Sequence, residues 1–310
     1  MKSRTTRTMS TRTKILSAIG LGAAAALALS ACSPPGTSSA SGTVENGDQK
    51  AMKMVVFNGW DEDTAASELW KYVLEDKGYD VELDYADVAP AYQGLSQGDY
   101  DAVLDTWLPN THKSYMEKYG DDLEDLGSWN DQTSLEVTVN ADAPIDSLAD
   151  LAAHKDDFGG RIVGIEPGAG LTSVVKDDVM DAYGLDDWEL VTSSTPAMLS
   201  ELKKSEKDGS DIVVTLWRPH WAYNAFDVKD LDDPKGALGD NETIHTVVKK
   251  DFRDDFPQAA KWLTAFSMDS DTLYSLEDAL VNSGADQSEY QSIVEKWVGE
   301  HQDYVDSLTK

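Results

Sequence analysis

The sequence predicts an α/β fold built from two similar lobes. Three observations support this. Apolar runs rich in β-formers alternate with helical stretches, the same order of elements occurs twice, and each copy ends in a Trp-x-Pro turn. Alternating strands and helices favour mostly parallel sheets with helices on both faces. Ligands of such sheets bind beyond the carboxyl ends of the strands, so we expect the site there.

The first 51 residues are predicted to precede the folded part. Residues 1–14 are basic, residues 15–31 are apolar, and Cys32 follows Leu29-Ser30-Ala31. This order is typical of a secretory signal, whose apolar stretch is shorter than the roughly 20 residues of a spanning helix. The Leu-Ser-Ala-Cys end resembles a bacterial lipobox, which implies a lipoprotein signal peptide over residues 1–31 and lipidation of Cys32. Residues 32–51, rich in Ser, Gly and Thr, predict a flexible tether that keeps the protein lipid-anchored outside the cell.

Cys32 is the only cysteine in the chain, so no intramolecular disulfide can form. At this position lipidation explains a lone cysteine better than redox chemistry does.

The first α/β unit is expected over residues 52–112. Strands are predicted at 52–58, 81–86 and 101–104, and helices at 64–77 and 92–97, each helix followed by a glycine that ends it. The third strand leads into Trp107-Leu108-Pro109.

The second unit repeats this order over residues 161–220. Strands are predicted at 161–165, 188–192 and 211–215, and helices at 171–183 and 196–204. Asp211 precedes Trp217 by six residues, as Asp101 precedes Trp107. We interpret this as an internal duplication.

The two units are predicted to belong to two lobes. The chain crosses over near residues 137–144 and returns near 244–249, and residues 258–310 are expected to be helical. Lobe 1 would then comprise residues 52–140 with 245–310, and lobe 2 residues 141–244.

The charge balance excludes several classes of function. The chain has 57 acidic and 26 basic residues, a formal net charge of −31. Such a surface repels phosphate backbones and anionic headgroups, so we exclude nucleic-acid binding and electrostatic membrane docking. The acidity itself is explained by a solvated surface, with salt adaptation left open.

Three of the nine tryptophans are candidates for the ligand site: Trp60, Trp107 and Trp217. Taken singly, each is better explained as a core residue than as a ligand contact. Taken together, all three fall at carboxyl ends of predicted strands, where duplication would bring them to one cleft. Aromatic faces arranged as a cage bind quaternary ammonium, each contact contributing about 0.5–2 kcal/mol.

Two further features are candidates for holding an anionic group at the other end of a ligand. The loop 166–170 opens a helix, and unpaired N–H groups at a helix start favour anions, although a simple structural turn explains the glycines equally well. It lacks the Gly-Lys-Ser/Thr of a nucleotide-binding loop. His112 lies close enough to Trp107 in sequence to donate a hydrogen bond to a carboxylate, or it is a structural histidine. His220, near Trp217, is the second candidate and ranks lower.

Five segments together resemble the glycine betaine/proline betaine-binding proteins of ABC importers, most of all the OpuAC type of Gram-positive bacteria. The resemblance runs from about residue 52 to 305. The segments are Gly59-Trp60-Asp61-Glu62-Asp63, Tyr92-Gln93-Gly94-Leu95-Ser96-Gln97-Gly98-Asp99, Trp107-Leu108-Pro109-Asn110-Thr111-His112, Gly168-Ala169-Gly170 and Val214-Thr215-Leu216-Trp217-Arg218-Pro219-His220-Trp221.

The resemblance implies a type II periplasmic-binding-protein clamp. Trp60, Trp107 and Trp217 would surround the trimethylammonium group, and His112 with the backbone N–H groups of Gly170 and Leu171 would hold the carboxylate. It implies an ABC permease and its ATPase subunit as partners, uptake of an osmoprotectant as the function, and no cofactor or metal.

Alternatives remain at this point. A choline or carnitine binder would use the same cage, and choline would leave the carboxylate pocket without a charged partner. A secreted hydrolase is disfavoured because no nucleophile motif or metal-spaced set occurs, so we expect no enzyme. A structural or adhesive lipoprotein would not need tryptophans at the strand ends.

Overall fold

The computed structural model of the protein describes residues 42–281 and 283–310. The predicted signal peptide and Cys32 lie outside the described residues. Within the described part, no helix has the length and apolar character needed to cross a bilayer.

The first sheet has five strands in the order β2-β1-β3-β10-β4. β1 pairs in parallel with β2 and β3, whereas β10 is antiparallel to both β3 and β4. These strands are β1 (Ala51–Phe57), β2 (Asp80–Ala86), β3 (Ala102–Leu108), β4 (Leu123–Asn130) and β10 (Thr243–Lys249).

The second sheet repeats this plan in the order β7-β6-β8-β5-β9. β6 is parallel to β7 and β8, and β5 is antiparallel to β8 and β9. These strands are β5 (Ser134–Asn140), β6 (Arg161–Val163), β7 (Glu189–Val191), β8 (Val213–Arg218) and β9 (Val228–Asp230). The two-lobed α/β fold is therefore confirmed. The sheets are mixed rather than mostly parallel. The strands on either side of the two crossovers, β4, β5, β9 and β10, pair with their neighbours in the antiparallel direction.

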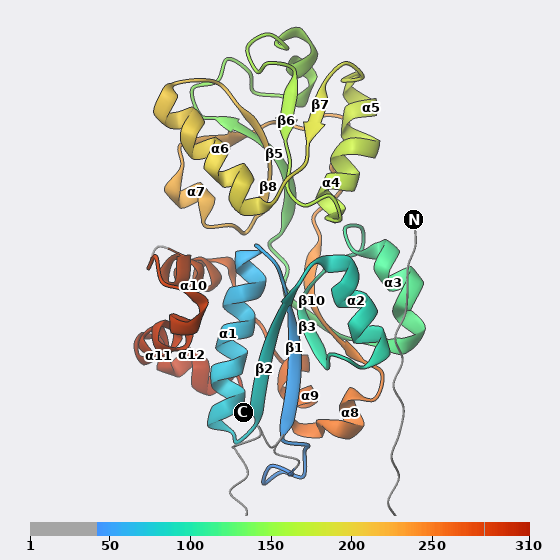
Figure 1. Ribbon diagram of the computed structural model, residues 1–310, viewed down its shortest axis with the longest axis vertical. Helices are drawn as coiled ribbons and strands as arrows, with labels where there is room; N and C mark the ends of the chain where they lie inside the picture. The colour runs from blue at the N-terminus through green and yellow to red at the C-terminus, as the bar shows by residue number, and fades with distance from the viewer. Residues whose placement is uncertain (1–41, 282) are drawn as a thin grey trace, which may run out of the picture. The chain divides into compact units, whose positions relative to one another are not determined.

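Helices of the first lobe come from both ends of the described chain. They are α1 (Asp61–Asp76), α2 (Val88–Gln97), α3 (Lys113–Tyr119), η1 (Gly120–Asp122), α8 (Phe252–Asp255), α9 (Pro257–Thr264), α10 (Ser270–Val281), η4 (Gln287–Glu289), α11 (Tyr290–Glu300) and α12 (Gln302–Ser307). The prediction of a helical C-terminal part is confirmed. Figure 1 shows α1 beside α10, α11 and α12, and α1 contacts α10 and α11.

The second lobe contains η2 (Leu148–Ala153), α4 (Gly170–Val174), the π-helical segment η3 (Val175–Val179), α5 (Met180–Tyr183), α6 (Thr195–Asp208) and α7 (Ala222–Ala225). The segments α4, η3 and α5 follow one another without a break, so they together form the helix that the sequence predicted over 171–183. Gly184 ends this run in the left-handed conformation, with φ of 66°.

Helix α1 begins three residues earlier than predicted, directly after Trp60. Its first turn holds Asp61, Glu62 and Asp63, and negative side chains are favoured at the positive end of a helix dipole. The carboxylate of Asp63 accepts hydrogen bonds from the backbone N–H of Phe57 and from the Ser67 hydroxyl, at 2.7 and 3.0 Å. These bonds join the end of β1 to the start of α1 and so fix the turn that carries Trp60.

Two predicted boundaries differ from the structure. The tether was expected to reach residue 51, but Asp48 is buried and accepts hydrogen bonds from the first N–H groups of α9 (Gln258 at 3.0 Å, Ala259 at 3.2 Å), so the folded part begins earlier. Lobe 1 was expected to reach residue 140, but 134–140 form β5, which pairs with β8 in the second sheet. The first crossover therefore lies at residues 131–133.

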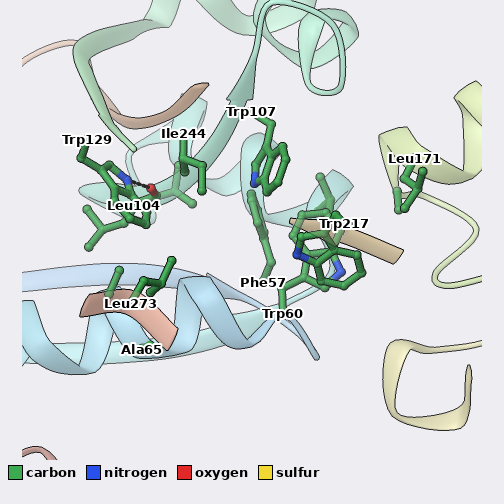
Figure 2. Packing of buried hydrophobic residues seen from close by; sticks show 14 of the residues in the cluster. Phe57, Trp60, Ala65, Leu104, Trp107, Trp129, Leu171, Trp217, Ile244 and Leu273 are labelled. Carbon is green, nitrogen blue, oxygen red and sulfur yellow. Dashed lines mark hydrogen bonds between the residues drawn. The ribbon is translucent and has the colours of Figure 1, made fainter. Parts of the chain in front are cut away.

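The core of the first lobe lies between its sheet and the helices α1 and α10. Trp129 of β4 is buried there, and its indole N–H donates to the carbonyl oxygen of Leu104 at 2.6 Å, which Figure 2 shows as a dashed line. Ala65 and Leu273 pack in the same cluster from α1 and α10. A satisfied tryptophan of this kind is a core residue.

Candidate ligand-binding site

The three predicted tryptophans line one cavity. Its free volume is about 20 Å³, far below the roughly 300–1,000 Å³ of pockets for drug-sized ligands, so the walls of the cavity lie close together. Figure 2 shows the three indoles close together, with Leu171 on a neighbouring segment. The lining residues are Trp60, Glu62, Trp107, Thr111, Leu135, Ile165, Ala169, Leu171 and Trp217.

Both lobes contribute to this cavity. Trp60 is the residue before α1 and Trp107 lies in β3, both in the first lobe, whereas Trp217 lies in β8 of the second. The rings of Trp60 and Trp217 are 6.3 Å apart between centroids, with an angle of 57° between their planes. All three tryptophans are buried. A ligand between them would therefore touch rings from both lobes at once.

Side chains behind the cage fix two of the indoles. The indole N–H of Trp107 donates to Asp105 Oδ1 at 2.7 Å, and that of Trp60 to Glu166 Oε2 at 3.3 Å. The buried Nε1 of Trp217 has no hydrogen-bond partner within the described chain. Because these bonds are made at the ring edges, they leave a face of each ring open to the cavity.

His112 lies behind Trp60 and does not line the cavity itself. Its ring stacks on Trp60 with centroids 5.7 Å apart and planes 12° apart. Its Nδ1 accepts the backbone N–H of Trp107 at 2.9 Å. Burial lowers the pKa of His112 to about 3, so the ring is neutral and its remaining proton is on Nε2. This buried Nε2–H has no partner within the described residues, so it is a free donor.

His220 occupies the corresponding place behind Trp217. Their centroids are 4.6 Å apart in an edge-to-face arrangement, and His220 Nδ1 accepts the backbone N–H of Ala222 at 3.0 Å. Burial lowers the pKa of His220 to about 3 as well. The duplication seen in the sequence thus extends to the histidines, and His220 is as well placed to support a ring as His112 is.

Gly170 is the first residue of α4, where the second lobe meets the first. A Cβ at this position would lie 2.2 Å from the carbonyl oxygen of Thr111 and 2.5 Å from its Cγ2. Only glycine allows the backbone to approach that closely. Leu171 follows, and its buried side chain lines the cavity.

Direct hydrogen bonds also join the lobes around the cage. Glu166 of the second lobe accepts from Trp60 and also from the backbone N–H and hydroxyl of Thr195, at 2.8 and 2.9 Å. The Tyr115 hydroxyl of the first lobe donates to the carbonyl oxygen of Gly168 at 3.1 Å. The Trp60–Glu166 and Tyr115–Gly168 bonds join the two lobes beside the cavity, as expected for a closed clamp.

Several site residues were not predicted from the sequence. Glu62 and Thr111 line the cavity, and Glu166 links the lobes. Glu62 and Thr111 stand inside motifs that the sequence analysis quoted, so proximity to Trp60 and His112 was the available signal. Nothing in the sequence pointed to Leu135, which comes from the crossover strand β5.

A comparison with known families matches most of the chain. The sequence profile of the substrate-binding domain of the ABC-type glycine betaine transport system, OpuAC, matches residues 53–300. The chain belongs to this family. Its members are transport binding proteins, so the expectation of a binding protein and not an enzyme is confirmed.

Solved structures and a curated relative resemble this member of the family. Lactococcal OpuAC, closed with glycine betaine, is 33% identical with a TM-score of 0.77, over 84% of this chain and 100% of that one. ProX of Borrelia burgdorferi is 31% identical with a TM-score of 0.78, over 84% and 97%. The glycine betaine/carnitine transport binding protein GbuC of Listeria monocytogenes is 40% identical over 169 residues, which are 54% of each chain. The match thus spans about half the length of GbuC.

Proposed function

We propose that this protein captures glycine betaine, or the related proline betaine, outside the cytoplasmic membrane and delivers it to an ABC permease with its ATPase subunit. The observation that carries the proposal is the cavity lined by Trp60, Trp107 and Trp217. A quaternary ammonium group has no N–H to donate, so ring faces and burial of its methyl groups must hold it. Three such contacts at about 0.5–2 kcal/mol each supply several kcal/mol before ordering costs.

The ligand carboxylate would be held at the opposite end of the site. The Nε2–H of His112 and the backbone N–H groups of Gly170 and Leu171 are the donors that we assign to it, although only Leu171 of these three lines the cavity between the tryptophans in this structure. Two observations support the assignment: Nε2 is protonated and without a partner, and first-turn N–H groups of a helix have no carbonyl within the helix to bond. A zwitterion then meets ring faces at one end and donors at the other.

A choline- or carnitine-binding protein is the second candidate. It is favoured by Glu62, an acid that lines the cavity and suits any cation, with or without a carboxylate. A choline-binding protein in complex with choline is 25% identical to this chain with a TM-score of 0.75.

Calorimetric titration of the purified protein with glycine betaine, proline betaine, carnitine and choline separates the candidates. We expect the betaines to bind more tightly than choline by tenfold or more, because a charged hydrogen bond contributes about 1.5–3 kcal/mol. Equal or tighter binding of choline would contradict the betaine assignment, and binding of none of the four would contradict the function itself.

The proposed site of action depends on Cys32, which we assign as the lipidated N-terminus of the mature protein. Cys32→Ser should release the protein from the membrane fraction, because one missing acyl-cysteine removes the whole anchor. Fractionation of cells that express the two forms tests this. Retention of the variant in the membrane would show that residues 15–31 span it.

A further inference from the structure

Glu62 is the only acidic side chain on the wall of a mostly apolar cavity in the described part of the chain. It lies in the first turn of α1, is 1% exposed, and lines the space between the three tryptophans. Its buried Oε2 has no hydrogen-bond partner within the described residues. A buried carboxylate oxygen without a partner is costly, which favours either protonation of Glu62 or a positive charge beside it.

The groups around Glu62 make its ionisation harder in the ligand-free protein. Burial, followed by the charges of Asp105 on β3 and Glu277 on α10, raises the pKa of Glu62 well above its ordinary value, and Asp61 on α1 acts in the same direction. No cation is among the groups that act on it within the described chain. His112, buried in the same lobe, is neutral and supplies no positive charge.

Three of the other acids of this cluster have structural partners, whereas both buried carboxylate oxygens of Glu277 have no hydrogen-bond partner within the described residues. Asp63 binds the Phe57 N–H and Ser67, and Asp105 Oδ1 binds the Trp107 indole. Asp61 accepts from the indole N–H of Trp221 at 2.5 Å. Among these five acids, Glu62 alone lines the cavity, so it is the one that an entering ligand meets.

We infer that Glu62 is the counter-ion of the bound cation, and that its carboxyl O–H releases the proton to solvent when a quaternary ammonium group enters the cage. The inference rests on the proposed function and deepens it. The step balances, because one O–H bond breaks, the proton passes to the buffer, and the ligand's fixed positive charge faces the new carboxylate.

This exchange predicts how affinity depends on pH. The ligand cation lowers the pKa of Glu62 in the complex relative to the free protein, so the complex holds fewer protons. Affinity is then greatest above the free-state pKa and falls as pH drops, by up to about tenfold per pH unit, until it levels off below the bound-state pKa. Titration of His112 would give the opposite pH dependence, because a neutral imidazole that meets the ligand carboxylate takes up a proton on binding.

The test is calorimetric titration of the whole protein with glycine betaine and with choline, in buffers of different ionisation enthalpy and across pH. We expect release of a fraction of one proton, up to one, for both ligands. The carbon analogue 3,3-dimethylbutanoate has the shape of glycine betaine without the positive charge, so it should release none. Glu62→Gln keeps the shape of the side chain and removes its proton, so binding of this variant should release no proton and lose its pH dependence.

A matched control removes one acid elsewhere on the same helix. Glu75 is exposed in the last turn of α1, so Glu75→Gln should leave proton release unchanged. If Glu62→Gln does not fold, the proton count of the unmodified protein still decides, because betaine binding without proton release at any pH would overturn the inference.

Other outcomes are also decisive. Proton release that persists in a folded Glu62→Gln variant would assign the proton to another group and overturn the inference, while the proposed function would stand. Absence of binding of any quaternary ammonium ligand would overturn both.

Discussion

Substituting Gly170 by alanine tests the claim that the two lobes must meet closely for binding. The added methyl group would lie 2.2 Å from the backbone carbonyl oxygen of Thr111, in the opposite lobe. Ordinary contact begins near 3.4 Å, so the two backbones must separate by about 1.2 Å at this point. A backbone carbonyl cannot rotate away as a flexible side chain can, so the separation falls on the lobes.

The loss of affinity follows from that displacement. The second lobe supplies Trp217 and the apolar wall around Leu171, and a gap of 0.5–1 Å forfeits about a quarter to a half of a dispersion contact. Loss of much of one cation–π contact, worth about 0.5–2 kcal/mol, adds to this. We expect Gly170→Ala to weaken glycine betaine binding by about 1.5–3 kcal/mol, which is roughly tenfold to a hundredfold.

Titration followed by intrinsic tryptophan fluorescence measures this loss. Gly168→Ala is the matched control, because a Cβ there meets nothing nearer than the Tyr115 hydroxyl at 3.9 Å. Both variants should melt at the temperature of the unmodified protein without ligand, since neither change touches the core of a lobe. Gly170→Ala binding as tightly as Gly168→Ala would refute the argument that lobe contact at Thr111 is needed.

Three other substitutions probe the cage and its supports. Trp107→Ala should weaken glycine betaine binding by tenfold or more, since about 0.5–2 kcal/mol of cation–π contact and part of the apolar wall are lost. Calorimetry on a variant shown to be folded by circular dichroism measures this. Unchanged binding would remove Trp107 from the site. His112→Ala should weaken the binding of both glycine betaine and choline, because the stack on Trp60 is lost, but it should weaken glycine betaine binding about tenfold more. An equal loss for the two ligands would show that His112 only supports Trp60. Glu166→Gln should speed ligand release about two- to tenfold in stopped-flow fluorescence. Both carboxylate oxygens of Glu166 accept hydrogen bonds, so the amide nitrogen of a glutamine would face an N–H or O–H donor and one of these bonds would be lost. An unchanged release rate would show that this link does not hold the closed form.

The alternation of strands and helices was sufficient to predict the fold. Both predicted units exist as two five-stranded sheets with the same internal order, and the helix after Gly170 was predicted to within one residue. The sequence could not show that β4, β5, β9 and β10 join the sheets antiparallel. Pairing between strands far apart in sequence leaves no local signal, and for this reason the crossover was placed too late.

The grouping of Trp60, Trp107 and Trp217 around one cavity was predictable because each lies in a local pattern at a strand end. The residues that contact the tryptophans and Glu62 from behind could not be predicted, because they come from segments far apart in the sequence. Glu166 reaches Trp60 across 106 residues, and Glu277 joins the acids near Glu62 from a C-terminal helix. Asp48 was hidden in a segment with the composition of a linker, yet it forms hydrogen bonds with α9 more than 200 residues away.

The central claim is that a quaternary ammonium group lies between Trp60, Trp107 and Trp217. A crystal structure of the protein with glycine betaine tests it most directly. We predict the trimethylammonium group within about 6 Å of all three ring centroids, with the carboxylate turned toward His112 and the start of α4. Density for the ligand outside this cavity, or with its carboxylate among the indoles, would contradict the account.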